Sequence, residues 1–137
     1  MMALLELKNI TKTYAGEVSV EVLQQIDLKV PEGEFISIMG PSGSGKTTML
    51  NLVATLDKPT AGSVIIKGEQ PLELSKQKLA EFRRRQLGFV FQNYNLLSPL
   101  SVLENVILPL TLDRVPVPEM KERSEQLLRE LGIYEKK

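Results

Sequence analysis

The residues best suited to chemistry form one glycine-rich segment, residues 40–47, which reads Gly-Pro-Ser-Gly-Ser-Gly-Lys-Thr. This segment fits the pattern G-x-x-x-x-G-K-[ST] at every fixed position. Its glycines let the main chain turn tightly, so that successive N–H groups point into one concavity that can hold phosphate oxygens. A lysine there reaches the β- and γ-phosphates of a nucleotide, and the hydroxyl of the following threonine can ligate Mg²⁺. The segment therefore predicts a binding site for a nucleoside triphosphate and Mg²⁺.

The predicted phosphate site uses main-chain and side-chain groups of the loop. Lys46 supplies a point charge and Thr47 a metal ligand. The residues assigned to the site are Gly40, Ser42, Gly43, Ser44, Gly45, Lys46 and Thr47. A chance match is the alternative, but residue frequencies produce this pattern in well under ~1% of chains of this size.

The loop needs a strand before it and a helix after it. Residues 35–39 form a short, mostly apolar run, which is typical of a strand buried on both faces. Residues 46–56 predict a helix, whose first N–H groups and positive dipole end would add to the anion site. This strand–loop–helix context is the one in which the pattern binds phosphate.

Further strands and a helix are expected around this unit. Alternating apolar residues predict a strand at 5–10, one or two strands at 18–30 and a strand at 64–66, and the apolar run 87–91 predicts another buried strand. Ser75 is expected to cap a polar helix that runs to Gln86, with Leu79 and Phe82 as its main apolar contacts. Interleaved strands and helices predict an α/β fold.

Two helices are expected in the last third of the chain. Residues 101–104 have the spacing of a capping box, so a helix should start there and be stopped or kinked at Pro109. After a linker at 113–117, Pro118 suits the first turn of a second helix, which Gly132 ends. The apolar residues expected to share one face of this helix are Met120, Leu127, Leu128 and Leu131.

Composition excludes several classes of site. The 137 residues suit one domain, and equal numbers of basic and acidic residues, 17 each, give no sign of a nucleic-acid partner. The three arginines at 83–85 are expected to form a solvated helix face. Without cysteine or histidine, disulfides and thiolate or imidazole metal sites are excluded. No apolar run approaches about 18 residues, and the N-terminus lacks the features of a signal peptide, so a cytoplasmic location is expected.

Several runs together resemble the N-terminal half of an ABC transporter ATP-binding subunit, over residues 5–112. The matching runs are 7–14, 40–50, 57–62, 87–97 and 101–106. They follow the order of the family, which is far more specific than the glycine-rich loop alone. The nearest group is the one that serves macrolide export and lipoprotein release. The resemblance implies a P-loop NTPase (RecA-like) α/β core with leading antiparallel strands, which binds ATP and Mg²⁺.

Two residues of the ATP-binding core gain roles through this resemblance. Tyr14 falls where the family places an aromatic ring that stacks on adenine, an interaction that stabilises binding by about 1–3 kcal/mol per base. The alternative is that Tyr14 only packs at a strand end. Thr48 is expected to offer a hydroxyl to the α-phosphate, although taken alone it could equally be an ordinary helix residue.

Gln92 follows the apolar run 87–91, as the family's Q-loop glutamine follows its strand. The resemblance implies that its amide ligates Mg²⁺ or orients water, and that its loop reports the nucleotide state to a membrane-spanning subunit. The alternative is an ordinary surface glutamine.

Other motifs of the family are not found in this chain. The family hydrolyses ATP between two ATP-binding subunits, using an L-S-G-G-Q signature, an Asp-Glu pair after a strand (Walker B) and a later histidine. After Gln92 the only glycine is Gly132, and the only aspartate, Asp113, precedes Arg114. We therefore expect this chain to bind ATP but not to hydrolyse it alone, because losing a catalytic base commonly costs ~10²–10⁴-fold in rate.

The resemblance also implies how the chain is divided. Residues 1–92 would form the ATP-binding core, and residues 93–137 the Q-loop and the start of the helical subdomain, so that the chain is truncated inside that subdomain. The implied partners are a membrane-spanning subunit and a second ATP-binding subunit, at the cytoplasmic face of the membrane. Because the family's Walker B strand lies beside the P-loop strand, its absence predicts an open apolar surface and marginal stability.

Two alternatives remain open from the sequence. The chain could belong to another P-loop class, such as a small-molecule kinase, but Tyr14, Gln92 and the run 95–97 argue against this. It could also be a truncated, non-catalytic piece with a regulatory or dimerising role.

Overall fold

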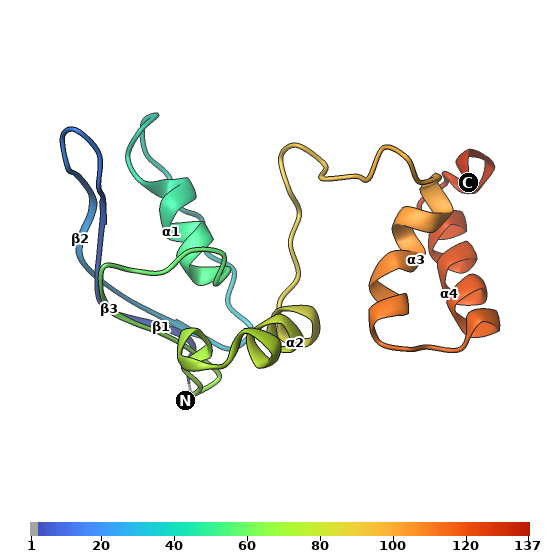
Figure 1. Cartoon of the computed structure of the whole chain (residues 1–137), viewed down its shortest axis with the longest axis horizontal. Coiled ribbons are helices and arrows are strands. Elements are labelled where there is room, and N and C mark those ends of the chain that lie inside the picture. Colours follow the sequence, from blue (N-terminus) through green and yellow to red (C-terminus); the bar gives the residue numbers. More distant parts are fainter. Residues whose placement is uncertain (1–2) are drawn as a thin grey trace. The chain divides into compact units, whose positions relative to one another are not determined.

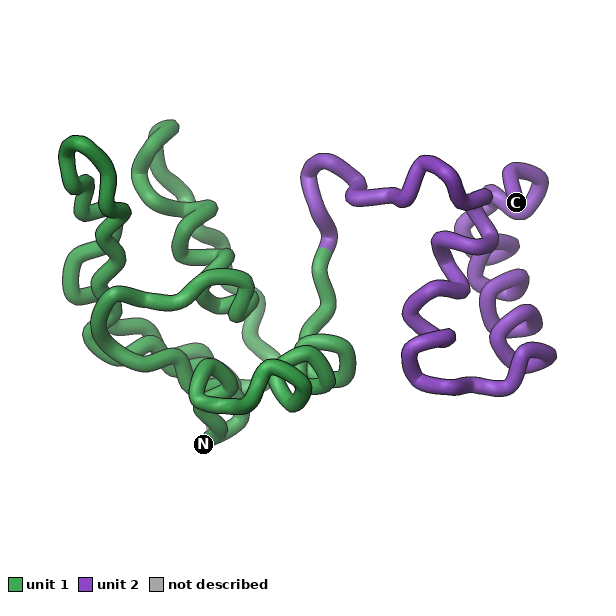
Figure 2. The backbone as a smooth tube through the Cα atoms, in the orientation of Figure 1, with its two compact units in different colours: residues 1–89 green, residues 90–137 purple. Residues whose placement is uncertain are grey.

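A computed structural model describes residues 3–137. The chain forms two compact units, of which the first ends at Phe89 and the second is Val90–Lys137 (Figure 2). Each unit is described by itself. Among the described residues, no helix combines the length and the apolar character that crossing a bilayer requires.

The first unit is built on an antiparallel sheet, shown in Figure 1. Its strands are β1 (Ala3–Tyr14), β2 (Val20–Pro31) and β3 (Ala61–Ile66), in the order β2-β1-β3. Strands β1 and β2 form a long hairpin in which Leu7 lies opposite Leu28 and Tyr14 opposite Val20. The pairing of β1 shifts between Leu7 and Ile10, with Asn9 at a φ of 49°. This bulge brings Leu7 and Ile10 to the buried side despite their odd spacing.

Helices α1 (Lys46–Val53) and α2 (Lys76–Gln86) complete the first unit, with a short 3₁₀ turn, η1 (Pro71–Glu73), between β3 and α2. Figure 1 shows α1 alongside the β1–β2 hairpin. The Ser75 hydroxyl caps α2 by accepting from the Lys78 N–H, as predicted. The core of the unit combines residues from all three strands and both helices: Leu7, Ile10, Leu23, Leu52, Val64, Ile66 and Phe82. Burial of these side chains is the main stabilising term.

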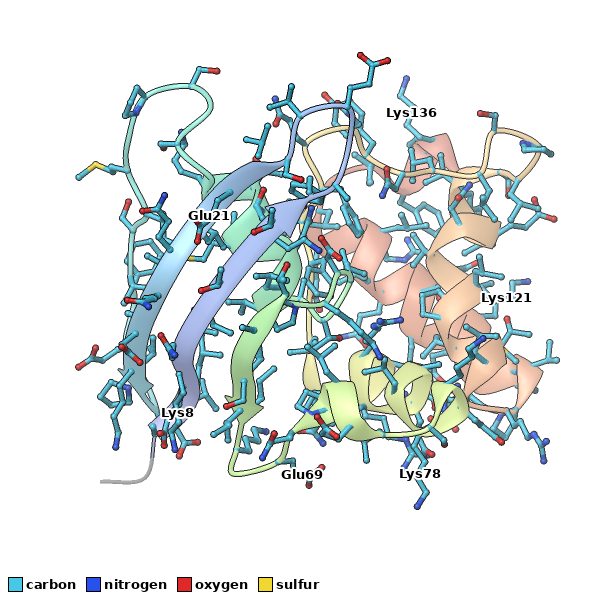
Figure 3. The ribbon with its side chains drawn as sticks, turned by 60° about the vertical axis from the view of Figure 1, so that its left-hand side comes forward. Lys8, Glu21, Glu69, Lys78, Lys121 and Lys136 are labelled. Atoms are coloured by element: carbon cyan, nitrogen blue, oxygen red, sulfur yellow. The ribbon has the colours of Figure 1, made fainter. Side chains whose placement is uncertain are left out.

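Several charged side chains lie on the outside of the first unit. Lys8, Glu21 and Lys78, which Figure 3 labels, are all exposed. The solvated face expected for the arginines at 83–85 is only partly present. Arg85 is exposed, but Arg83 and Arg84 are half-buried, and the Arg83 side chain donates to the Thr55 hydroxyl, because α2 packs beside the end of α1.

The second unit is a helical hairpin of α3 (Val102–Leu112) and α4 (Val117–Glu130), followed by a 3₁₀ turn, η2 (Tyr134–Lys136). The predicted capping box is present, because the Ser101 hydroxyl accepts from the Glu104 N–H at 3.2 Å and the Glu104 carboxylate accepts from the Ser101 N–H at 2.7 Å. Helix α3 continues through Pro109 and is not stopped there. Pro118 lies in the first turn of α4, and Gly132, at a φ of 69°, follows its end.

Two predicted strands are wrong. Residues 35–39 and 87–91 have no strand structure, and within them Phe35 is 95% exposed and Val90 is fully exposed. A strand buried on both faces needs neighbours on both sides to satisfy its main-chain groups. The sheet of the described residues consists of β2, β1 and β3, so it offers these runs no such neighbours.

Three smaller expectations are corrected. The segment 18–30 forms one strand, and the helix after the glycine-rich loop ends at Val53 instead of continuing to residue 56. On α4, Met120 and Leu128 are buried as expected, but Leu127 and Leu131 are exposed. Leu127 lines an open concavity between α3 and α4 instead of being packed against α3.

An apolar groove of about 490 Å³ remains open in the first unit. Its lining includes Leu5, Leu28, Ile36, Met49, Val53 and Leu87. The two runs that were predicted as strands contribute to this lining through Ile36 and Leu87.

Replacing Leu52 tests the core. Leu52 has no exposed surface, whereas Leu50 in the same helix is 53% exposed. We expect Leu52→Ala to lower the free energy of unfolding by about 2–5 kcal/mol, because it leaves a cavity, and Leu50→Ala to change it by less than about 1 kcal/mol. Urea denaturation followed by circular dichroism measures both. Equal losses in the two variants would contradict this packing.

Candidate functional site

The glycine-rich loop packs directly against β2. Gly45 adopts a φ of 84°, a left-handed conformation that glycine takes at little cost. A Cβ atom at this position would lie 2.9 Å from Leu23 Cδ2 and 3.0 Å from the Val22 carbonyl oxygen. Gly45 is also the residue before α1, and its carbonyl accepts from the Met49 N–H at 2.8 Å. The close approach to β2 therefore fixes both the loop and the start of α1.

The loop surrounds a concavity of about 350 Å³. It is lined by Val22 and by the loop residues Ser42, Gly43, Ser44, Gly45, Lys46, Thr47 and Thr48. Within residues 3–137, no side chain caps the N-terminus of α1. The first N–H groups of this helix are thus available to an anion, which the helix dipole also favours.

The Lys46 ammonium lies over the loop that precedes it. It donates to the carbonyl oxygens of Gly40 at 2.9 Å and Pro41 at 2.6 Å, and lies 3.4 Å from the Ser44 hydroxyl. Gly40 therefore belongs to the loop through this hydrogen bond, although it does not line the concavity. The loop therefore combines the Lys46 ammonium with main-chain amides and hydroxyls, which are the types of group that bind phosphate.

Tyr14 lies at the end of β1, on the hairpin that also supports the loop. It pairs with Val20, and the same strand β2 carries Val22, which lines the loop. The Tyr14 hydroxyl donates to Asp57 Oδ2 at 3.0 Å, and the Lys12 ammonium lies 4.7 Å from the centre of its ring. The ring stays 42% exposed. Tyr14 and the β2 residues that contact the glycine-rich loop thus lie on one hairpin.

Lys12 and Asp57 were given no role by sequence reasoning. Lys12 is buried, and its ammonium donates to Asp57 Oδ1 at 2.8 Å and to the Lys58 carbonyl oxygen at 2.7 Å. The hydrogen bond from Lys12, together with those from the Lys58 N–H and the Tyr14 hydroxyl, outweighs burial and lowers the pKa of Asp57 below its ordinary value. The available signal was the position of Lys12 two residues after Ile10, which places both side chains on one face of a strand, because a charge on a buried face requires a partner.

Gln92 lies in the second unit, in an exposed segment without regular structure. Tyr14 and the glycine-rich loop lie in the first unit. Gln92 and the other predicted site residues thus belong to different units, and the role of Gln92 stays a prediction.

The loop suits a magnesium ion that arrives with a nucleotide. Thr47 offers an exposed hydroxyl, and among residues 3–137 no three acidic, histidine or cysteine side chains cluster to hold a metal by themselves. Mg²⁺ commonly keeps waters and phosphate oxygens among its ligands and needs few from the protein. The donor set therefore fits Mg²⁺ bound through phosphates.

Comparison with known proteins decides the family, because the family described as ABC transporter matches residues 23–137. The chain belongs to the ABC transporter ATP-binding family. The ABC transporter ATP-binding protein YxdL of Bacillus subtilis is 51% identical over 133 residues, which are 97% of this chain and 52% of that protein. The macrolide export ATP-binding/permease protein MacB of Aggregatibacter actinomycetemcomitans is 42% identical over 136 residues, which are 98% of this chain and 21% of that protein.

Solved structures of ABC ATP-binding cassettes agree. The cassette MJ0796 of Methanocaldococcus jannaschii, described as a dimeric post-hydrolysis state bound to ADP and Pi, matches with a TM-score of 0.83 at 46% identity. The match covers 91% of this chain and 56% of that one. The predicted family and α/β P-loop fold are thus confirmed, and the chain spans about half the length of the curated ABC relatives it matches, 52% in the case of YxdL.

The space around two glycines predicts different effects on nucleotide binding. Gly43 has a φ of 79° and nothing within 4 Å of the position that a Cβ atom would take, whereas Gly45 has a similar φ and no room. Both alanine variants carry backbone strain, but only Gly45→Ala must also displace β2. We expect Gly45→Ala to weaken MgATP binding at least about tenfold more than Gly43→Ala, as a further 1.4 kcal/mol would do. Isothermal titration calorimetry compares them, and equal losses would show that the contact with β2 is unimportant.

The Asp57 contacts predict a pH dependence of stability. Because the pKa of Asp57 is lowered in the folded state, its stabilising effect is complete above the ordinary value and is lost as the pH falls through the folded-state value. We expect the difference in unfolding free energy between the wild type and Asp57→Asn to be constant above about pH 5 and to shrink below about pH 4. Urea denaturation at pH 3 to 7 measures it. A difference that stays the same down to pH 3 would contradict this assignment.

Proposed function

We propose that this chain binds MgATP as the nucleotide-binding part of an ABC transporter that couples ATP hydrolysis to export across the membrane, or to extraction from it. The observation that carries the proposal is the glycine-rich loop, which places the Lys46 ammonium and the uncapped start of α1 around one concavity. The membership of the chain in the ABC transporter family supports the same interpretation.

The loop residues would divide the work of holding the triphosphate. Main-chain N–H groups of residues 43–47 would hold the phosphates, and the Lys46 ammonium, which donates to two carbonyl oxygens in this structure, would donate to the β- and γ-phosphate oxygens. Thr47 would ligate Mg²⁺, which neutralises charge on these phosphates, and Thr48, half-buried in the first turn of α1, would reach the α-phosphate. Tyr14 would stack on the adenine, because its ring is partly exposed at the end of the β1–β2 hairpin.

Hydrolysis would require groups that this chain does not supply. Positioning and charge stabilisation can come from Lys46, Thr47 and Mg²⁺. Activating water needs a carboxylate near the γ-phosphate, and after Gln92 the sequence has no Asp-Glu pair and no glycine-rich signature. We therefore propose that the chain by itself binds ATP without significant turnover, and that Gln92 contributes to catalysis only in a complete assembly.

The proposed partners are a second ATP-binding subunit and a membrane-spanning subunit, with the chain at the cytoplasmic face of the membrane. The solved cassette MJ0796 is described as dimeric, which supports the first partner. The segment after Gln92 supports the second, because Tyr94 and Leu96 expose large apolar surfaces that a partner protein can cover.

Removing the Lys46 charge tests the proposal. Charge-assisted hydrogen bonds contribute about 1.5–3 kcal/mol, so Lys46→Ala should weaken MgATP binding roughly 10- to 100-fold. Lys8→Ala is the matched control, because it removes the same charge from an exposed position on β1, far along the strand from Tyr14. Calorimetry at fixed ionic strength measures both. Equal affinities for the wild type and Lys46→Ala would leave the loop without a role in nucleotide binding.

A further inference from the structure

The contacts of Tyr14 go beyond what stacking on a base requires. Two side chains hold it: the Lys12 ammonium over its ring and the Asp57 carboxylate at its hydroxyl. We propose that Lys12 and Asp57 are positioning residues, which fix the Tyr14 ring in the orientation that receives the base of the nucleotide. This inference rests on the proposed nucleotide-binding function and deepens it.

The Lys12 ammonium has a fixed position. Lys12 is only 9% exposed, and an ammonium with so little access to water needs partners inside the protein. Two acceptors supply them, Asp57 Oδ1 at 2.8 Å and the Lys58 carbonyl oxygen at 2.7 Å. The Lys58 N–H in turn donates to Asp57 Oδ1 at 2.7 Å. The cation and the carboxylate therefore form one closed group, which can serve as a rigid support.

This group determines how the ring is oriented. The hydroxyl of Tyr14 is held by Asp57 Oδ2 at 3.0 Å, which fixes the far end of the side chain. The Lys12 ammonium, 4.7 Å from the ring centre, favours the rotation that turns a face of the ring towards it. Since the ring is still 42% exposed, a base would stack on the face that Lys12 does not cover.

The same group connects the ring to the phosphate loop. Asp57 follows α1, and its N–H donates to the Asn51 carbonyl oxygen at 3.2 Å. Helix α1 begins at Lys46, so Asp57 is attached to one end of the helix whose other end forms the phosphate site. Asp57 and Lys12 thus set the ring relative to the phosphates through a single helix. A ring held in advance binds more tightly, because less side-chain freedom is lost on binding.

Comparing two ligands separates the base from the phosphates. MgATP carries both, whereas magnesium tripolyphosphate carries only the phosphate chain. We expect Asp57→Ala to weaken MgATP binding about three- to tenfold, a part of the stacking contribution, and to leave the affinity for magnesium tripolyphosphate unchanged. Glu6→Ala is the control, because it removes the acceptor of an ion pair on the same strand and should change neither affinity.

A second variant covers the case in which Asp57→Ala does not fold. Tyr14→Phe keeps the ring and the bond between Lys12 and Asp57 and removes only the hydroxyl, and it should weaken MgATP binding at least about twofold, as the loss of a weak hydrogen bond does. Calorimetry measures both ligands, and Tyr14→Ala gives the full contribution of the ring.

Each outcome decides between distinct conclusions. If Tyr14→Ala binds MgATP weakly while Asp57→Ala and Tyr14→Phe bind it like the wild type, the ring acts without positioning and the inference is wrong. An equal loss for MgATP and tripolyphosphate would also overturn it, because the effect would then pass through the phosphate loop. If the wild type binds neither ligand, the proposed function itself fails.

Discussion

The close contact between Gly45 and β2 is the constraint on which the site depends. The main chain of Gly45 approaches Val22 and Leu23 so closely that no side chain fits between them. Because Gly45 directly precedes α1, this contact fixes where the N-terminal end of the helix lies, which is the end proposed to bind phosphate. The hairpin that provides the contact also carries Tyr14 at the end of β1. One sheet therefore supports the groups proposed to bind the phosphates and the base.

The C-terminal end of α1 is also held by contacts with the rest of the first unit. The Arg83 side chain, from α2, donates to the Thr55 hydroxyl through Nε at 3.0 Å and also to the Thr55 carbonyl oxygen. Thr55 is buried and adopts a φ of 57°, which is unfavourable for a β-branched residue. These bonds from α2, together with Asp57 just beyond, hold the chain where it leaves the helix. Helix α1 is thus held at both ends, so the residues at its two ends keep a fixed separation.

Local features of the sequence were sufficient for much of this description. The glycine-rich loop, the caps at Ser75 and Ser101 and the end of α4 at Gly132 depend on residues close in sequence, and the structure has all of them where they were predicted. The strand predictions for 35–39 and 87–91 were wrong, because a buried strand depends on neighbouring strands that can lie far away in sequence. The pairing of Lys12 with Asp57 joins residues 45 positions apart and could not be read from either segment alone. The position of Lys12 on the same strand face as Ile10 indicated that it needs a partner, but not which residue provides it.

The hydrogen bonds of Lys46 have a consequence for the speed of ligand capture. Its ammonium donates to the carbonyls of Gly40 and Pro41, so it is already engaged with main-chain oxygens of the loop. A triphosphate must take over these bonds one at a time, and each carbonyl must then find water or another donor. Capture would therefore include a rearrangement within the protein after the first encounter. The observed rate constant of binding would then stop rising in proportion to ligand concentration and reach a plateau set by this rearrangement.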